Sequence, residues 1–203
     1  MLSRRDLLSI LPAGAAACMG CASTALCSQN PTHPAVPAAA AAGPGTSAEM
    51  SWEQAFRFRY KGYIRLMKKL SAHMGDEKFL SLLSAASAEN ATDSSVQVKP
   101  EPGREMENFT RFFLNDLMPD PMYRAALTWE VVEKSPTALE FRYSRCLWAS
   151  TFRAQDAGEI GYATVCYGDY GYTTASCPGI KLIRTKTLMQ GDAYCNHRFV
   201  VAS

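Results

Sequence analysis

The stretch that decides the fold spans residues 126–146 and reads ALTWEVVEKSPTALEFRYSRC. Apolar side chains occupy every second position from Leu127 to Val131, which is the period of a strand with one buried face. A Lys-Ser-Pro-Thr turn follows at 134–137, and the alternation resumes over 139–143. The stretch therefore predicts a β-hairpin, with further elements expected on either side of it.

Helices are predicted on the N-terminal side of this hairpin. The first begins at Ser51, which forms a capping-box pattern with Gln54, and it ends at Gly75. Aromatic and apolar residues recur at helical spacing between these ends. A second helix begins near Asp76, and a third spans about 104–118 before a pair of prolines.

On the C-terminal side the pattern predicts two helices, over 148–157 and 159–175, and then a second pair of strands. Residues 180–188 are predicted as a strand, 190–192 as a turn and 194–201 as the last strand. The expected fold class is α+β. It consists of N-terminal helices followed by a small antiparallel sheet, with two helices inserted between its hairpins.

Length and composition limit the classes of protein to which the chain can belong. The chain has 203 residues, of which 47% are hydrophobic and 20% charged, as in one ordinary globular domain. This excludes a wholly disordered chain, a collagen and a coiled coil. The net charge of +2 gives no reason to expect a nucleic-acid partner.

The N-terminal residues 1–27 are predicted to be an export signal. Arg4 and Arg5 precede a moderately apolar stretch and a run of small residues, which favours the twin-arginine route and its export machinery. A chance arginine pair in a Sec signal is the alternative. Cys18 and Cys21 are candidates for a lipidated first residue of the mature protein, so an exported lipoprotein is an alternative prediction.

The remaining chain divides into a linker over 28–48, rich in proline and alanine, and a folded domain over 49–203. The expected location is periplasmic or extracytoplasmic. Contact with the membrane is expected only through the candidate lipid anchor.

The first predicted helix is strongly basic, which is typical of docking to an anionic membrane or simply of a solvated face. Its cations are Arg57, Arg59, Lys61, Arg65, Lys68 and Lys69.

Four of the seven cysteines lie in the domain, and none belongs to a Cys-x-x-Cys pair, so a zinc-ribbon or thioredoxin site is not indicated. Two disulfides in an exported protein are a structural alternative. The domain cysteines are Cys146, Cys166, Cys177 and Cys195.

Two local patterns carry candidate chemistry. Cys166 and Asp169 are three residues apart on a predicted helix, which places them on one face. A thiol beside a carboxylate suits a nucleophile with a proton acceptor or two ligands of a metal, or a buried cysteine and a surface acid. The predicted turn at 190–192 brings Arg184 or Thr187 near the last strand and its cysteine.

Together these pieces resemble the L-2-amino-thiazoline-4-carboxylic acid hydrolase family. The matching pieces, in order, are Arg145-Cys146, Cys166-Tyr167-Gly168-Asp169, the stretch from Pro178 to Leu188, and Gly191-Asp192 with Cys195 and Phe199. Asn196 and His197 depart from the family, in which an acidic residue commonly follows this cysteine.

The resemblance implies a hydrolase that opens a cyclic 2-aminothiazoline acid to N-carbamoyl-cysteine. Asp169 is the expected general base for water, with Cys166 and Cys195 as further candidate catalytic residues, either of which could attack directly. The expected substrate contacts come from one arginine fork for the carboxylate and nearby hydrogen-bonding groups. The candidates for these contacts are Arg184, Thr187, Arg145 and Cys146.

No cofactor is predicted, and a divalent metal is an alternative because cysteine, aspartate and His197 are suitable ligands. The leading interpretation is therefore an exported hydrolase with a small-molecule substrate. The main alternative is an exported or membrane-tethered domain that binds a small ligand without catalysis. A metal- or redox-handling cysteine protein is a third.

Overall fold

The computed structural model describes residues 50–98 and 101–202. The predicted export signal over 1–27 and the linker over 28–48 lie outside the described residues. The helical elements in chain order are α2 (Trp52–Met74), α3 (Asp76–Asp93), α4 (Glu105–Phe112), η2 (Phe113–Leu117), α5 (Pro121–Ala126), α6 (Leu147–Arg153), α7 (Gly158–Gly161), η3 (Tyr162–Cys166), α8 (Gly168–Ser176) and η4 (Leu188–Gln190). The strands are β1 (Leu127–Lys134), β2 (Ala138–Cys146), β3 (Ile180–Ile183) and β4 (Cys195–Val201).

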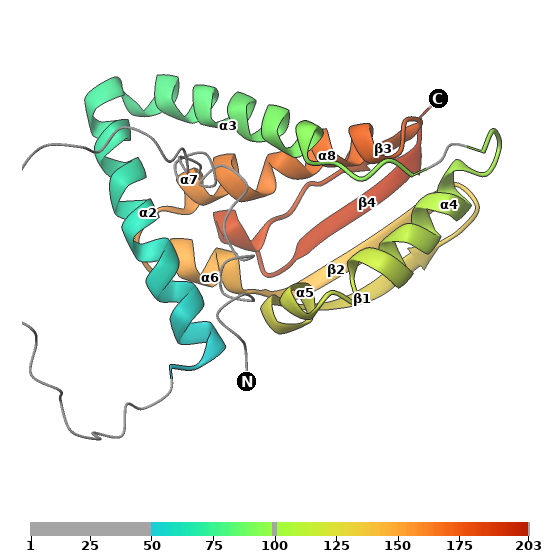
Figure 1. Cartoon of the computed structure of the whole chain (residues 1–203), viewed down its shortest axis with the longest axis horizontal. Coiled ribbons are helices and arrows are strands. Elements are labelled where there is room, and N and C mark those ends of the chain that lie inside the picture. The colour runs from blue at the N-terminus through green and yellow to red at the C-terminus, as the bar shows by residue number, and fades with distance from the viewer. Residues whose placement is uncertain (1–49, 99–100, 203) are drawn as a thin grey trace, which may run out of the picture.

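The four strands form one antiparallel sheet in the order β1-β2-β4-β3. The predicted hairpin is its first pair, and the helical stretch from α6 to α8 connects β2 to β3 (Figure 1). The α+β prediction, with helices before the sheet and between its strand pairs, is confirmed. The capping box at Ser51 and Gln54 is confirmed as well, because both of its hydrogen bonds are present.

The inner face of the sheet is built from residues that lie opposite one another on β2 and β4. Leu139 pairs with Phe199, and Tyr143 pairs with Cys195, so these side chains point to the same side. Helix α4 and η2 cover this face and pack Phe109 and Phe113 against the ring of Phe199. This aromatic packing fixes the sheet against the helices that precede it in the chain.

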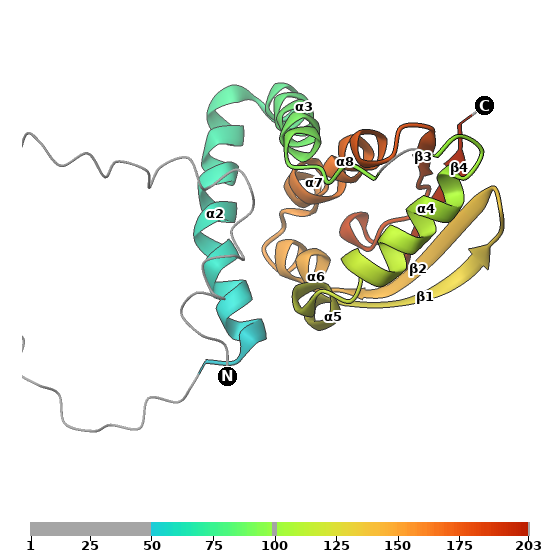
Figure 2. The same cartoon turned by 45° about the vertical axis from the view of Figure 1, so that its right-hand side comes forward.

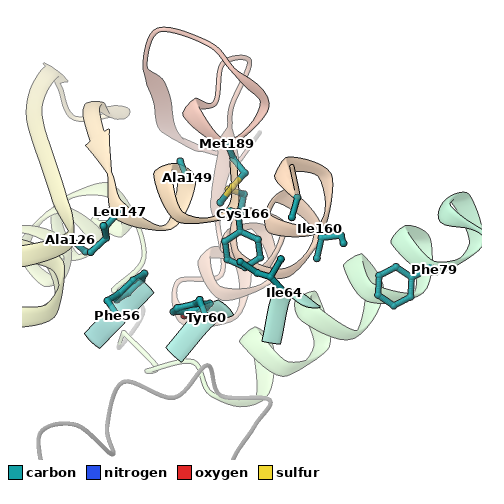
Figure 3. Packing of buried hydrophobic residues seen from close by; sticks show 12 residues of the cluster. Phe56, Tyr60, Ile64, Phe79, Ala126, Leu147, Ala149, Ile160, Cys166 and Met189 are labelled. Carbon is teal, nitrogen blue, oxygen red and sulfur yellow. The ribbon is translucent and has the colours of Figure 1, made fainter. Parts of the chain in front are cut away.

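A second core lies between α2 and the helices that follow β2. The inner side of α2 presents Phe56, Tyr60 and Ile64 toward α6, α7 and Met189 (Figure 3). Phe56 lies edge-on to Trp148, whose indole nitrogen donates a hydrogen bond to the Tyr60 hydroxyl at 3.0 Å. The long N-terminal helix is thus attached to the molecule along one side only.

The close approach of α3 and α8 depends on a glycine. A Cβ atom at Gly171 would overlap with the carbonyl oxygen of Ala88, so a larger side chain would push the two helices apart. Because α8 also packs against β3, this contact holds α8 against the sheet. Within the part of the chain that the structure describes, no helix is long and apolar enough to cross a membrane.

Two details of the strands differ from the prediction. Val131 pairs with Phe141 on the expected side of the sheet but is 39% exposed, and a bulge follows it between Val131 and Glu133. Glu133 then accepts a hydrogen bond from Arg198. The predicted strand over 180–188 ends at Ile183. Beyond that point the side chain of Asn196, rather than a neighbouring strand, accepts hydrogen bonds from the next backbone N–H groups.

Candidate functional site

The candidate site lies where α8 meets the inner face of β4. Asp169 comes from the first turn of α8, Arg184 from the segment after β3, and His197 from β4. One guanidinium nitrogen of Arg184, Nη1, lies 2.7 Å from Asp169 Oδ2 and 3.3 Å from His197 Nε2. The fold therefore joins three residues that are distant in sequence through a single nitrogen atom.

Arg184 is the buried centre of this group. Its side chain is only 1% exposed, and its second terminal nitrogen donates to the carbonyl oxygen of Cys166 at 2.7 Å. The guanidinium carbon also lies 5.4 Å from the ring centroid of Tyr162 and 5.0 Å from that of Tyr170. These contacts hold the guanidinium in one place, and the guanidinium in turn positions Asp169.

Asp169 is surrounded by protein and yet reachable. Its side chain keeps 42% of its surface accessible, while burial raises the pKa of its carboxyl group and the Arg184 charge lowers it to a smaller extent. One side of the carboxylate is thus open to solvent, while protein atoms crowd the other. A reachable carboxylate with a raised pKa is suited to accept a proton.

His197 is neutral in this environment. Burial, reinforced by the nearby Arg184 charge, lowers the pKa of His197 to about 3. Because Arg184 donates to Nε2, the ring hydrogen belongs on Nδ1. The imidazole packs against the ring of Tyr143, with 4.7 Å between the ring centroids. Its position could be inferred from the strand alternation, which places it on the same face as Cys195.

The thiols near this group are free and protonated at neutral pH. All four cysteines of the described chain are free. Burial raises the pKa of Cys146 to about 12, and it also raises the pKa values of Cys166 and Cys195, with the Asp169 charge adding to each shift. Cys195 Sγ accepts a hydrogen bond from Leu188 N at 3.1 Å. A thiol with a raised pKa is a weak nucleophile.

Most of the residues predicted for the site lie close together in the structure. Thr187 caps η4 through its hydroxyl and lies 3.8 Å from Cys195 Sγ. Cys146 caps α6, where its sulfur accepts from Ala149 N at 3.4 Å. That Arg184 holds a substrate carboxylate stays a prediction, since in the structure its fork is already engaged by Asp169 and a carbonyl oxygen.

Arg145 lies apart from this group. Its guanidinium donates to the carbonyl oxygen of Ala125 at 3.0 Å and lies 3.6 Å from Glu53 on α2. Cys177 is also elsewhere, with its sulfur 3.8 Å from the Glu105 carbonyl oxygen. Alternation along the strand explains the position of Arg145, because successive strand residues point to opposite faces and its neighbour Cys146 lies nearer Asp169.

A protein metal site needs several ligating side chains that converge on one point. Among the residues described by the structure, the His, Cys, Asp and Glu side chains do not gather in a group of three or more that could hold a metal ion. Two hollows lie away from Asp169. One, of about 580 Å³, lies between α4 and the β1–β2 turn, and the other, of about 430 Å³, lies along α2.

Tyr162–Cys166 forms a π-helical turn immediately before α8. The backbone N–H of Tyr167 donates to the carbonyl oxygen of Tyr162 at 2.8 Å, five residues back, so the turn holds one residue more than an α-helical turn. The turn ends at Cys166, whose carbonyl oxygen accepts from Arg184 at 2.7 Å, directly before the helix that carries Asp169. Isolated π-turns of this kind occur frequently at functional sites.

Comparison with protein families identifies a match over most of the described domain. Residues 55–199 match the model of the L-2-amino-thiazoline-4-carboxylic acid hydrolase family. The match covers more than half of the chain and includes the Asp169, Arg184 and His197 group. A comparison with curated proteins found no similar sequence.

Proposed function

The chain belongs to the L-2-amino-thiazoline-4-carboxylic acid hydrolase family, and we propose that it is a hydrolase that opens a small cyclic substrate by water attack at an amidine-like carbon. The observation that carries this proposal is the reachable Asp169 carboxylate. It is held at 2.7 Å by a buried arginine, and burial raises its pKa. Such a group can take a proton from water during attack on the substrate.

In the proposed reaction Asp169 removes a proton from a water molecule as the water oxygen bonds to the ring carbon between nitrogen and sulfur. The bond from that carbon to sulfur then breaks, and the proton held by Asp169 passes to the leaving sulfur. The second water proton moves from the added oxygen to the ring nitrogen, so that this oxygen becomes the carbonyl oxygen of the product. With L-2-amino-thiazoline-4-carboxylate the product is N-carbamoyl-cysteine. Arg184 serves as a positioning residue, because it fixes the carboxylate that acts as the base.

The protonated thiols favour water over cysteine as the nucleophile. Cys166 and Cys195 both have raised pKa values, so little thiolate is present at neutral pH. Direct attack by either sulfur would require its deprotonation beside the negative charge of Asp169. We therefore assign the two cysteines to the walls of the site.

The proposal is tested by incubating the reduced chain with L-2-amino-thiazoline-4-carboxylate and following the product by mass. We expect Cys166→Ser and Cys195→Ser to keep turnover within about tenfold of the unmodified chain, because water is the nucleophile. Cys177→Ser, which changes a buried thiol outside the site, is the matched control.

A loss of turnover of a thousandfold or more in one site variant alone, with a covalent adduct on that cysteine in the unmodified chain, would show that the nucleophile is a thiol and not water. If a well-folded, reduced protein shows no turnover but is stabilised thermally by the compound, the function is ligand binding.

We propose further that residues 1–27 direct export through the twin-arginine route, with the domain then lying outside the cytoplasm. The supporting feature is the Arg4-Arg5 pair before an apolar stretch. Changing both residues to lysine is expected to retain most of the protein in the cytoplasm. Cell fractionation measures this, and unchanged export would point to the Sec route instead.

A further inference from the structure

Helix α2 presents a long face that no described element covers. Figures 1 and 2 show α2 along one edge of the molecule, with α6 and α7 on its inner side. Phe56, Tyr60 and Ile64 face inward and are buried, whereas Phe58 and Leu66 are 72% and 53% exposed. An amphipathic surface helix normally places polar residues on its outer face, so this exposed apolar surface needs an explanation.

The charge of the outer face is of one sign. Glu53 is the only acidic residue of α2, and it pairs with Arg57 at 2.8 Å. Farther along, four cations line an open hollow of about 430 Å³, and no acidic side chain lines it within the described chain. The lining residues are Lys61, Ile64, Arg65, Lys68, Lys69, Ala72 and Gln155.

The exposed aromatic ring and the cations lie on the same side of the helix. Phe58, Lys61, Arg65 and Lys69 are spaced at i, i+3, i+7 and i+11, which brings them onto one face. A basic face with an exposed aromatic side chain is the pattern by which helices lie in the plane of a membrane interface. A solvated basic face needs no exposed phenylalanine.

We propose that the outer face of α2 docks onto an anionic phospholipid membrane. The cations around the hollow would contact lipid phosphates, and Phe58 would enter the boundary between headgroups and acyl chains. This surface is separate from the Asp169 site, so the proposal does not depend on the hydrolase activity.

The position of α2 in the chain suits this role. The Pro/Ala-rich stretch 28–48 joins the N-terminal signal to α2, and its 21 residues limit the separation to about 75 Å by covalent geometry. A lipid on Cys18 or Cys21 would keep the basic face near the bilayer. Attachment by a lipid together with a polybasic patch is stronger than by either alone.

The test measures co-sedimentation of the full chain with vesicles of phosphatidylcholine alone or with one quarter phosphatidylglycerol. The test variant carries Lys61→Gln, Arg65→Gln and Lys69→Gln. The matched control carries the same loss of charge at exposed positions on other elements, Lys78→Gln, Lys134→Gln and Lys181→Gln. The N-terminal signal is identical in all three proteins.

We expect the α2 variant to lose about 100-fold in partitioning onto anionic vesicles, because each cation near such a surface contributes about fivefold. The control should lose no more than a few-fold, and Phe58→Ser should weaken binding without changing the salt dependence. Equal losses in the α2 variant and the control, unchanged binding of the α2 variant, or equal binding to neutral vesicles would each overturn the proposal. Ring opening by the α2 variant is expected to be unchanged, and this separates the two functions.

Discussion

Asp169→Asn is expected to lower kcat for ring opening by about 100-fold to 10,000-fold, the range in which a positioned general base contributes. The amide keeps an oxygen that can accept from Arg184, so the geometry of the pair is preserved. What the variant loses is the ability to take a proton from water. The measurement is the initial rate of N-carbamoyl-cysteine formation under saturating substrate.

Folding must be controlled in this experiment, because Arg184 is almost fully buried and loses its counter-charge. Asp76→Asn is the matched control. This carboxylate also accepts a hydrogen bond, from Ser71 at 2.6 Å, but it lies at the start of α3. A thermal melt of both variants shows whether either has unfolded.

The pH profile adds a readout that a structural role would not give. Burial raises the pKa of Asp169 above its ordinary value of 3.8, so activity of the unmodified chain should fall as the pH drops through that raised pKa. The residual activity of Asp169→Asn should lack this step. A variant that keeps its rate within tenfold would show that Asp169 is not the base.

The second large effect concerns stability in acid. His197 has a pKa of about 3 in the folded protein, against an ordinary value of 6.5. Between these values the unfolded chain binds a proton at this residue and the folded chain does not, so the free energy of unfolding falls as the pH is lowered from 6.5 to 3. The expected slope is about 1.4 kcal/mol for each pH unit.

His197→Gln should remove this slope, while Arg184 keeps an acceptor in the glutamine oxygen. Urea unfolding at half-unit steps from pH 7 to pH 4 measures it, with His73→Gln on the exposed end of α2 as the control. Asp169 acts in the opposite direction, because a raised pKa favours the folded state at low pH, but it is common to all three proteins. Parallel curves for the unmodified chain and His197→Gln would contradict the neutral, buried imidazole.

The fold could be predicted where local pattern and packing agree. The hairpin over 126–146 has alternating apolar residues on both strands and a turn of favourable residues, and the helix from Ser51 has a complete capping box, so both follow from short-range physics. The proximity of Cys166 and Asp169 can also be predicted from the sequence, because residues three positions apart on a helix lie close together.

The remaining parts of the site depend on long-range geometry. The bulge near Val131 and the end of β3 coincide with contacts to Arg198 and Asn196, which are more than 10 residues away and leave no local pattern. Arg145 lies apart from Asp169, although its neighbour Cys146 lies near the site, because the Arg145 side chain contacts Ala125 and Glu53 instead. Alternation predicts which side chains of β4 face inward, but the sequence of β4 does not predict that Arg184 contacts His197 there.

The π-turn over 162–166 has a consequence for how this site can change over generations. Because the turn differs from an α-helix by one inserted residue, removing any one of its five residues would restore regular winding. Because the widened turn absorbs its extra residue locally, helix α8 could keep its packing against α3 and β3, and the change would fall on the turn itself. Loss of a single codon would thus give a more regular helix while altering the turn that holds the Cys166 carbonyl oxygen against Arg184.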